Sequence, residues 1–284
     1  MIQTVVRFGH MIRFSHSLFA LPFALGAALL AARQGYHAEQ FLWILVAMVG
    51  ARSAAMGFNR LVDHQLDAAN PRTAGRELPQ GTLSRGAVIA FVVVAAAAFV
   101  VAAGMLNRTC LLLSPVALAI VFGYSYTKRF TYFSHIALGL GLAVAPVGAW
   151  LAIRGSFARE PLILAGAVVA WVAGFDIIYA CQDVEFDRQA RLHSIPARWG
   201  VARALVAARL LHAAAIILLG IVGVVATLHP AYFAGVAVIG ALLVVEHRLV
   251  HANDLSRVNA AFFTVNGWIS VAYLASVAVA VWLR

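Results

Sequence analysis

Two short stretches of the sequence carry polar side chains at a regular spacing that could bind a metal ion. In each stretch, three such residues follow one another at four-residue intervals: Asn59, Asp63 and Asp67 in the first, and Tyr179, Asp183 and Asp187 in the second. Residues four apart lie on one face of a helix, so each stretch predicts a polar stripe along a helix. Oxygen ligands without histidine or cysteine among them favour a hard cation, Mg²⁺ or Mn²⁺.

A further carboxylate, Asp176, begins the second stripe inside an apolar run. An isolated carboxylate at membrane depth costs at least about 2.5–3.5 kcal/mol, and like charges four residues apart repel each other. A simpler alternative is that the acids pair as solvated helix ends with nearby arginines, namely Arg60, Arg72, Arg188 and Arg191. Two motifs with the same spacing favour a shared cation site over that alternative.

The elements that must position these stripes are predicted to be membrane-spanning helices. Hydrophobic residues make up 63% of the 284 residues and charged residues only 11%, which leaves too little polar surface for a soluble domain. A spanning helix needs about 20 apolar residues. The candidate runs are 17–32, 41–58, 86–106, 109–126, 133–153, 161–180, 203–226, 231–250 and 262–283. We therefore expect an all-α integral membrane protein, with nine transmembrane helices in a single bundle and one domain over residues 1–284.

The basic residues predict the orientation of this bundle, because Lys and Arg concentrate in cytoplasmic loops. The side that holds the N-terminus has fourteen of them: Arg7, Arg13, Arg60, Arg72, Arg76, Arg85, Lys128, Arg129, Arg188, Arg191, Arg198, Arg203, Arg248 and Arg257. The opposite side has five: Arg33, Arg108, Arg154, Arg159 and Arg284. Arg52 and Arg209 fall inside predicted spans. The N-terminus is therefore expected to be cytoplasmic and the C-terminus to lie on the opposite side.

Both acidic motifs are expected on that cytoplasmic side. They start 120 residues apart, at the ends of the second and sixth predicted spans. Four crossings separate them, so they face the same side, where polar loops near 59–85 and 181–202 would cover a joint active site. The arrangement resembles the parallel internal repeats of some membrane proteins.

Basic side chains on the same side could complete this site by binding phosphate. The candidates are Arg60, Arg72, Arg76, Lys128, Arg129 and Arg198. Mg²⁺ usually binds through one or two carboxylates together with substrate phosphates. A diphosphate site at the mouth of an apolar bundle suggests a substrate with a polar head and an oily tail, and polyprenyl diphosphate fits. Metal and cationic side chains would stabilise the leaving diphosphate. Aromatic walls would shield the carbocation, and the candidates are Phe58, Tyr124, Tyr126, Phe175 and Tyr179.

At the level of motifs, "NRLVDHQLD" resembles the NxxxDxxxD motif, and "YACQDVEFD" the YxxxDxxxD motif, of the UbiA-type superfamily of intramembrane aromatic prenyltransferases. The stretches "NPRTAGRELPQG" and "YSYTKRF" extend the resemblance over most of the chain. It implies an Mg²⁺-dependent enzyme that binds a prenyl diphosphate between the two motifs. Such an enzyme alkylates an acceptor in or near the membrane, here expected to be the bacterial inner membrane.

Carried over by position, the resemblance implies two metal sites, with one Mg²⁺–diphosphate unit at Asn59, Asp63 and Asp67 and the other at Asp183 and Asp187. It implies diphosphate contacts from Arg60, Arg72 and Lys128. Tyr179 would shield the cation or help deprotonate the ring intermediate, and Asp176 would orient Tyr179 or the acceptor. The sequence departs from many relatives at "DVEFD" and at Arg191, where glycine is common.

Within the superfamily, the chain looks most like the 4-hydroxybenzoate polyprenyltransferase branch. "GRELPQG", "LSPVAL", "APVGAW" and "LHSIPARWG" also resemble a menaquinone-linked sub-branch, whose acceptor is 1,4-dihydroxy-6-naphthoate. Either acceptor implies C-alkylation of a hydroxylated aromatic carboxylate in quinone biosynthesis, with release of diphosphate.

Other functions remain open at this point. A haem-type farnesyltransferase or a lipid-ether synthase of the same superfamily would differ from this branch in the acceptor pocket. A secondary transporter would place its acids near span centres rather than at helix ends beside basic loops. Nucleic acid is not an expected partner, because the basic residues have no soluble domain on which to lie. Cys110 and Cys181 are too few and too far apart for a disulfide framework or a thiolate metal site.

Overall fold

The computed structural model describes residues 2–12 and 19–283, and within these ranges the chain forms helices and loops without a β-strand. The all-α prediction is confirmed. Arg13 and Arg284 of the charge count, and the first residues of the predicted span 17–32, lie outside the described residues.

Eight helical segments in the described part of the chain are long and apolar enough to cross a membrane. They are α3 (Ala38–Val62), α5 (Arg85–Leu106), α6 (Arg108–Thr127), α7 (Ser134–Arg154), α8 (Arg159–Ala180) with its continuation, α11 (Val201–Val225), α12 (Ala231–Leu249), and α13 (Asn266–Trp282) with the preceding π-helix η3 (Ala260–Val265). The first predicted span corresponds to α2 (Leu21–Ala32), which has 12 residues. At 1.5 Å per residue this helix covers about 18 Å, less than the hydrocarbon core of about 30 Å. The prediction of nine spanning helices is therefore not confirmed.

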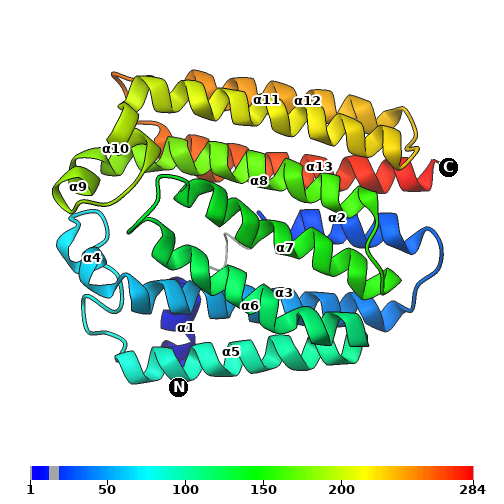
Figure 1. The fold of residues 1–284 in the computed structure, drawn as a ribbon, viewed down its shortest axis with the longest axis horizontal. Coiled ribbons are helices and arrows are strands. Elements are labelled where there is room, and N and C mark those ends of the chain that lie inside the picture. Colours follow the sequence, from blue (N-terminus) through cyan, green and yellow to red (C-terminus); the bar gives the residue numbers. More distant parts are fainter. Residues whose placement is uncertain (1, 13–18, 284) are drawn as a thin grey trace.

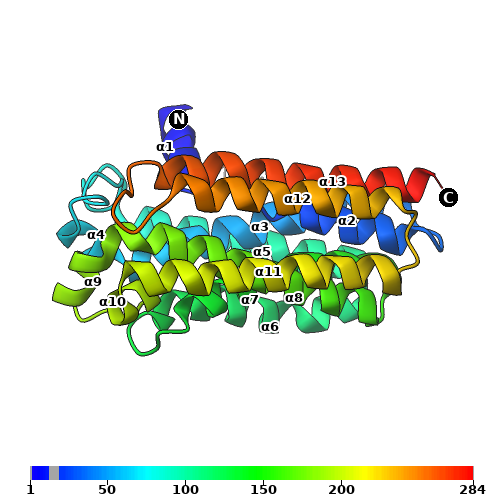
Figure 2. The same ribbon diagram turned by 90° about the horizontal axis from the view of Figure 1, so that it is seen from above.

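Shorter helices gather at one end of the bundle. They are α4 (His64–Ala69), the 3₁₀ turn η2 (Cys181–Asp183), α9 (Val184–Gln189) and α10 (Ile195–Trp199). Figure 1 shows α4, α9 and α10 together at the left end, whereas the C-terminal end of α13 lies at the right. Helix α1 (Ile2–Met11) projects from the bundle near the end that carries α4 (Figure 2). The predicted long polar loops are thus partly helical.

The long helices run side by side along a common direction (Figures 1 and 2). α8 packs against α7 and α11, and α3 packs against α5 and α6. Glycine permits the closest approaches: a Cβ atom on Gly139 would lie 2.7 Å from the carbonyl oxygen of Val169, and one on Gly50 would lie 2.9 Å from that of Ala95. Small residues at such contacts let membrane helices pack backbone to backbone.

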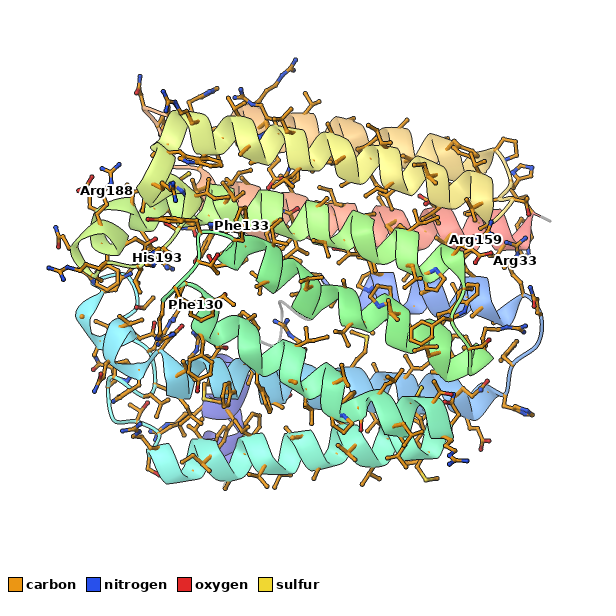
Figure 3. The ribbon with its side chains drawn as sticks, viewed as in Figure 1. Arg33, Phe130, Phe133, Arg159, Arg188 and His193 are labelled. Carbon is orange, nitrogen blue, oxygen red and sulfur yellow. The ribbon has the colours of Figure 1, made fainter. Side chains whose placement is uncertain are left out.

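Charged side chains mark both ends of the bundle. In Figure 3, Arg188 and His193 lie at the end with α9, and Arg33 and Arg159 lie at the other end. The Arg33 side chain donates a hydrogen bond to the carbonyl of Ala226 at 2.7 Å, which ties the end of α2 to the end of α11. The middle of the bundle surface is apolar, with exposed side chains such as Val94, Leu112 and Leu210, as expected where acyl chains surround a protein.

The two acidic motifs share a backbone feature. α3 ends at Val62 and α4 begins at His64, which leaves Asp63 between them with φ −91° and ψ 4°. Asp183 has nearly the same dihedral angles, φ −103° and ψ 7°, where the turn η2 meets α9. This sparsely populated region of backbone conformation is one where active-site residues often lie. Each motif is therefore a helix interrupted at its central aspartate, not the continuous helical stripe that the spacing predicts.

Candidate active site

A cavity of about 730 Å³ lies inside the bundle and reaches the end that carries α4 and α9. Residues of both motifs line it: Asn59, Asp63, Asp67, Asp176, Tyr179, Asp183 and Asp187. Basic side chains that we expected near a diphosphate also line it: Arg60, Arg72, Arg76 and Lys128. The structure thus brings the two motifs to one cavity, although 120 residues separate them in the sequence.

Asp63, the central carboxylate of the first motif, is buried and has three polar neighbours. The ammonium of Lys128 lies 2.6 Å from Oδ2, and the guanidinium of Arg129 lies 3.0 Å from Oδ1. Asn59 donates a hydrogen bond to Oδ2 at 3.1 Å. Lys128 and Arg129 directly follow α6, so the end of this helix brings two cations to the first motif.

Asp67, the last carboxylate of the first motif, is also buried. Its Oδ1 atom lies 2.6 Å from the guanidinium of Arg76, and Arg60 approaches Oδ2 to 4.0 Å. The Arg60 side chain also donates to the carbonyl of Met11 at 3.4 Å. The Oδ2 atom of Asp67 accepts no hydrogen bond. A buried carboxylate oxygen in this state has unused capacity to bind a cation or a donor.

Asp183, the central carboxylate of the second motif, contacts the loop that follows the first motif. Arg72 forms a bidentate ion pair with Asp183, in which Nε donates to Oδ1 at 2.9 Å and Nη2 donates to Oδ2 at 2.5 Å. Asn70 donates a further hydrogen bond to Oδ1 at 3.0 Å. Two-pronged arginine–carboxylate pairs are among the strongest side-chain hydrogen bonds. These contacts join the loop after the first motif to the second motif at the mouth of the cavity.

Tyr179 of the second motif also contacts Arg72. Arg72 donates to its hydroxyl at 2.9 Å, and the centre of the guanidinium lies 5.0 Å from the centroid of the ring. The Tyr179 ring also packs against Phe262 of η3, with centroids 4.2 Å apart. Burial acts to lower the pKa of Arg72, but the hydrogen bond to Asp183 and the nearby charges outweigh it and raise the pKa. Arg72 therefore stays cationic.

Asp187 of the second motif and the nearby Asp176 contact residues that the four-residue spacing does not predict. Ser194, which precedes α10, donates to Oδ2 of Asp187 at 2.7 Å. Asp176 lies 2.7 Å from Nδ1 of His135, a residue in the first turn of α7. His135 therefore supplies a partner for the deepest carboxylate of the site.

Some predicted site residues do not reach the cavity. The guanidinium of Arg198 lies over the ring of Tyr132, 4.5 Å from its centroid, and Arg198 is not part of the lining. Arg129 contacts Asp63 but does not line the cavity either. Phe58 stacks on Phe122, with centroids 4.5 Å apart, outside the cavity. Of the five predicted aromatic wall residues, those that line it are Tyr124, Phe175 and Tyr179.

The donor set suits Mg²⁺, a hard cation, because the two motifs supply carboxylate and carboxamide oxygens. The unsatisfied Oδ2 atom of Asp67 is one such oxygen. Within the described residues, no three or more His, Cys, Asp and Glu side chains are grouped closely enough to hold a metal ion by themselves. Mg²⁺ typically has one or two carboxylate ligands and takes the others from substrate phosphate and water. The residues present are compatible with this mode of binding.

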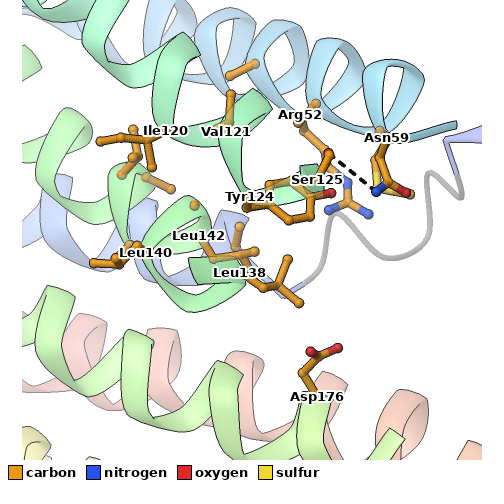
Figure 4. Close-up of a pocket in the computed structure, with 18 of the residues that line it drawn as sticks. Arg52, Asn59, Ile120, Val121, Tyr124, Ser125, Leu138, Leu140, Leu142 and Asp176 are labelled. Atoms are coloured by element: carbon orange, nitrogen blue, oxygen red, sulfur yellow. Dashed lines mark hydrogen bonds between the residues drawn. The ribbon is translucent and has the colours of Figure 1, made fainter. Parts of the chain in front are cut away.

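Beyond the motifs, the cavity wall becomes apolar, with residues such as Ile120, Leu138 and Leu142 (Figure 4). Arg52, from the middle of α3, also lines this part. Figure 4 shows Arg52 and Tyr124 on one wall and the carboxylate of Asp176 on the facing wall. An apolar chamber with polar groups on two facing walls suits an amphiphilic ligand.

The sequence patterns did not predict several residues of the site. Asn70, His135 and Ser194 bind motif carboxylates but stand outside the four-residue spacing. Arg52 could have been found from the sequence, because it is one of two arginines inside predicted spans. A charged residue within the membrane is by default a candidate functional residue.

Together, the fold and the site define a helical membrane protein with a metal-compatible cavity that is lined by basic side chains at one end and is apolar beyond them. The model of the UbiA prenyltransferase family matches residues 20–281, so the chain belongs to this family and is a transferase of prenyl groups.

Curated relatives agree with this family. The chain is 30% identical over 246 residues to the 4-hydroxybenzoate octaprenyltransferase of Chromohalobacter salexigens, covering 84% of this chain and 80% of that protein. It is also 30% identical over 230 residues to the enzyme of the same name from Cronobacter sakazakii, covering 79% of each.

Solved structures show the same fold. A UbiA homologue from Aeropyrum pernix K1, solved in its apo form, matches with a TM-score of 0.84 and 34% identity over 93% of this chain and 97% of that one. A UbiA homologue from Archaeoglobus fulgidus, bound to DMAPP and Mg²⁺, matches with a TM-score of 0.75 and 20% identity over 98% and 100% of the two chains.

Proposed function

We propose that this enzyme transfers a polyprenyl group from polyprenyl diphosphate to the ring of a hydroxylated aromatic carboxylate, in the biosynthesis of a quinone. The observation that carries the proposal is the cavity shared by both motifs, which has carboxylates and cations at its mouth and apolar walls beyond. Such a cavity fits a substrate with a diphosphate head and a hydrocarbon tail. The relatives named 4-hydroxybenzoate octaprenyltransferase support the same reaction.

The proposed cofactor is Mg²⁺, as two ions, with Asn59, Asp63 and Asp67 holding one and Asp183 and Asp187 the other. When bound, the metal supplies positive charge that stabilises the departing diphosphate. The family member from Archaeoglobus fulgidus that was solved with DMAPP and Mg²⁺ supports the use of this ion.

The basic residues of the chain are proposed to bind the diphosphate oxygens. Arg72 and Lys128 contact the motif carboxylates through hydrogen bonds. Arg60 approaches Asp67 more distantly, at 4.0 Å. When a diphosphate enters with its metal, these cations can turn from carboxylate to phosphate oxygens, so that the charges remain paired. Tyr179, which contacts Arg72, is proposed to shield the allylic cation.

The acceptor is proposed to lie in the chamber beyond the motifs. Arg52 on the wall of this chamber is a cation suited to the carboxylate of an aromatic acid. Both 4-hydroxybenzoate and 1,4-dihydroxy-6-naphthoate carry that carboxylate and a ring hydroxyl. The bond between the prenyl carbon and the diphosphate oxygen breaks, which gives diphosphate and an allylic cation. The ring carbon then attacks this cation, and the ring loses a proton.

For the topology we propose a single domain with nine crossings, α2 being the first, in a bacterial inner membrane. The motif end would face the cytoplasm and the C-terminus the other side. The excess of Lys and Arg at the motif end supports this orientation.

Mass spectrometry of reaction products tests the proposal. Purified protein would be incubated with Mg²⁺ and polyprenyl diphosphates of several lengths. The acceptor panel would contain 4-hydroxybenzoate, 1,4-dihydroxy-6-naphthoate, haem and a glyceryl lipid. We expect a prenylated hydroxyaromatic acid, and its formation should stop with EDTA and return with added Mg²⁺. Prenylation of haem or the glyceryl lipid alone, or activity that ignores chelation, would overturn the proposal.

A further inference from the structure

We propose that Asn266 and Glu246 are positioning residues that hold the π-helix η3 in place, so that the ring of Phe262 shields the allylic cation beside Tyr179. The inference rests on the proposed function and adds to it a buried polar support behind the cavity wall.

Phe262 of η3 belongs to an aromatic cluster next to the second motif. It lines the cavity, and its ring centroid lies 4.2 Å from that of Tyr179 and 5.2 Å from that of Phe175. Tyr179 and Phe175 are four residues apart on α8 and share one face of this helix, so Phe262 packs against both. Because Tyr179 contacts Arg72, Phe262 lies close to the position proposed for the diphosphate. Aromatic ring faces stabilise a neighbouring positive charge.

The backbone that carries Phe262 is not an ordinary α-helix. η3 is a π-helix over Ala260–Val265, and α13 continues it from Asn266. π-helices are rare, mostly a single turn long, and frequent at functional sites. Because this backbone is less favourable than an α-helix, other contacts must hold it.

Asn266 makes contacts of this kind. Its side-chain Nδ2 atom donates to the carbonyl oxygens of Ala261 at 3.2 Å and Phe262 at 3.3 Å. The same nitrogen donates to Oε1 of Glu246 on α12 at 2.8 Å. The Oδ1 atom of Asn266 accepts a hydrogen bond from Nε1 of Trp171 on α8 at 2.7 Å. One carboxamide therefore joins the backbone of Phe262 to two neighbouring helices.

Glu246 and Trp171 together fix the direction of this carboxamide. The indole N–H is a donor only, so the carboxamide oxygen faces Trp171 and the NH₂ group faces Glu246. Both Glu246 and Asn266 are 0% exposed. Helices α12 and α13 pack side by side (Figure 2), and a buried, hydrogen-bonded polar network between them specifies one arrangement of the helices.

The expected consequence for the reaction concerns water. Neither Asn266 nor Glu246 lines the cavity, so they act on the reaction only through the residues that they hold. A closed apolar site keeps water from reactive intermediates. If the wall moves, water adds to the allylic cation and loses a proton, which gives a prenyl alcohol in place of the prenylated acceptor. The ratio of alcohol to prenylated acceptor does not depend on the amount of active protein.

Two variants of Glu246 separate positioning from bulk packing. In Glu246→Gln, the carboxamide oxygen can still accept from Asn266. The oxygen replaced by NH₂, Oε2, accepts no hydrogen bond and lies 3.8 Å from Nδ1 of His212. In Glu246→Leu, no acceptor remains. At saturating acceptor, we expect Glu246→Leu to raise the alcohol-to-product ratio about threefold or more. Glu246→Gln should stay within about twofold of wild type.

Ser276→Ala is the matched control. Ser276 is a buried polar residue further along α13, next to Gly235 of α12, and its hydroxyl donates to the carbonyl of Ala272. It makes no printed contact with η3, so its replacement should leave the ratio at the wild-type value.

A double variant tests whether Glu246 acts through Phe262. Phe262→Leu removes the ring but keeps an apolar side chain, and it should raise the ratio about threefold or more by itself. Combined with Glu246→Leu, it should raise the ratio no further than the larger single effect, because coupled changes are not additive. If Glu246→Leu does not fold, Asn266→Asp replaces it in the comparison. This variant keeps the acceptor for Trp171 and loses the donors to Glu246 and to the Phe262 carbonyl, so the same rise is expected.

The inference is overturned if Phe262→Leu keeps the wild-type ratio, or if the folded positioning variant, Glu246→Leu or Asn266→Asp, keeps it. It is also overturned if Glu246→Gln raises the ratio as much as Glu246→Leu, or if the two effects multiply in the double variant. Failure of the proposed function would look different, because the wild-type protein itself would then prenylate no hydroxylated aromatic acid.

Discussion

Arg72 and Asp183 form a two-pronged ion pair across the mouth of the cavity, although 111 residues separate them in the chain. Arg72 belongs to the loop after the first acidic motif, and Asp183 is the central carboxylate of the second. The same guanidinium donates to Tyr179. One side chain therefore connects the loop after the first motif to two residues of the second motif.

Replacing Arg72 should weaken the binding of the diphosphate substrate. Arg72→Ala removes a cation with several donors, so we expect kcat/KM for prenyl diphosphate to fall about tenfold to a hundredfold. Arg72→Lys keeps the charge but not the two-pronged geometry and should recover only part of the loss. Steady-state kinetics with varied prenyl diphosphate measures both effects.

Arg188 provides the matched control for this change. It lies at the same end of the bundle and pairs with exposed Glu185, at 3.5 Å. Exposed ion pairs of this kind contribute little, so Arg188→Ala should leave kcat/KM within about twofold of wild type. A loss equal to that of Arg72→Ala would indicate a general charge effect and contradict the specific contact.

Asp67→Asn should raise the Mg²⁺ concentration required for half-maximal activity. The change removes the charge of a carboxylate whose Oδ2 atom accepts no hydrogen bond, and carboxylates are the preferred protein ligands of this ion. A titration of activity against free Mg²⁺ measures the shift. Asp254→Asn is the control, because Asp254 is exposed and its carboxylate accepts a hydrogen bond from the backbone N–H of Ser256, outside the cavity. Equal Mg²⁺ curves for the Asp67 variant and wild type would argue against a metal ligand at this position.

Gly139→Ala should destabilise the contact between α7 and α8. A Cβ atom at Gly139 would lie 2.7 Å from the carbonyl oxygen of Val169, and such overpacking costs about 1–3 kcal/mol. Gly148→Ala, on the same helix, meets nothing within 4 Å and should be neutral or slightly stabilising, because alanine favours helices over glycine. Thermal unfolding in detergent compares the two variants, and a lower Tm for Gly148→Ala than for Gly139→Ala would contradict the packing.

The sequence predicted the helical bundle well, because long apolar runs have few structural options in a bilayer. The exception is α2, where residues 17–32 read as a span but the described helix has only 12 residues. Hydropathy measures composition and does not specify where a helix begins, particularly in a run of alanine and leucine without a capping residue.

The sequence predicted those residues of the candidate site that are charged and also repeat at a regular spacing. It did not predict the others. Asp63 and Asp183 stand at repeated intervals, and the structure brings them to one cavity. The spacing did not predict that both helices are interrupted at these residues. No sequence pattern indicated His135, because a single histidine at the start of a helix is common. Its contact with Asp176 is visible only in the fold.

The central claim is that both motifs form one site for metal-assisted transfer of a prenyl group. The most direct measurement is prenyl-transfer turnover, by product mass spectrometry, in Asp63→Ala and Asp183→Ala proteins whose elution and Tm in detergent match wild type. The account predicts that each substitution alone abolishes product formation in the presence of saturating Mg²⁺. Near-normal turnover in either folded variant would contradict it.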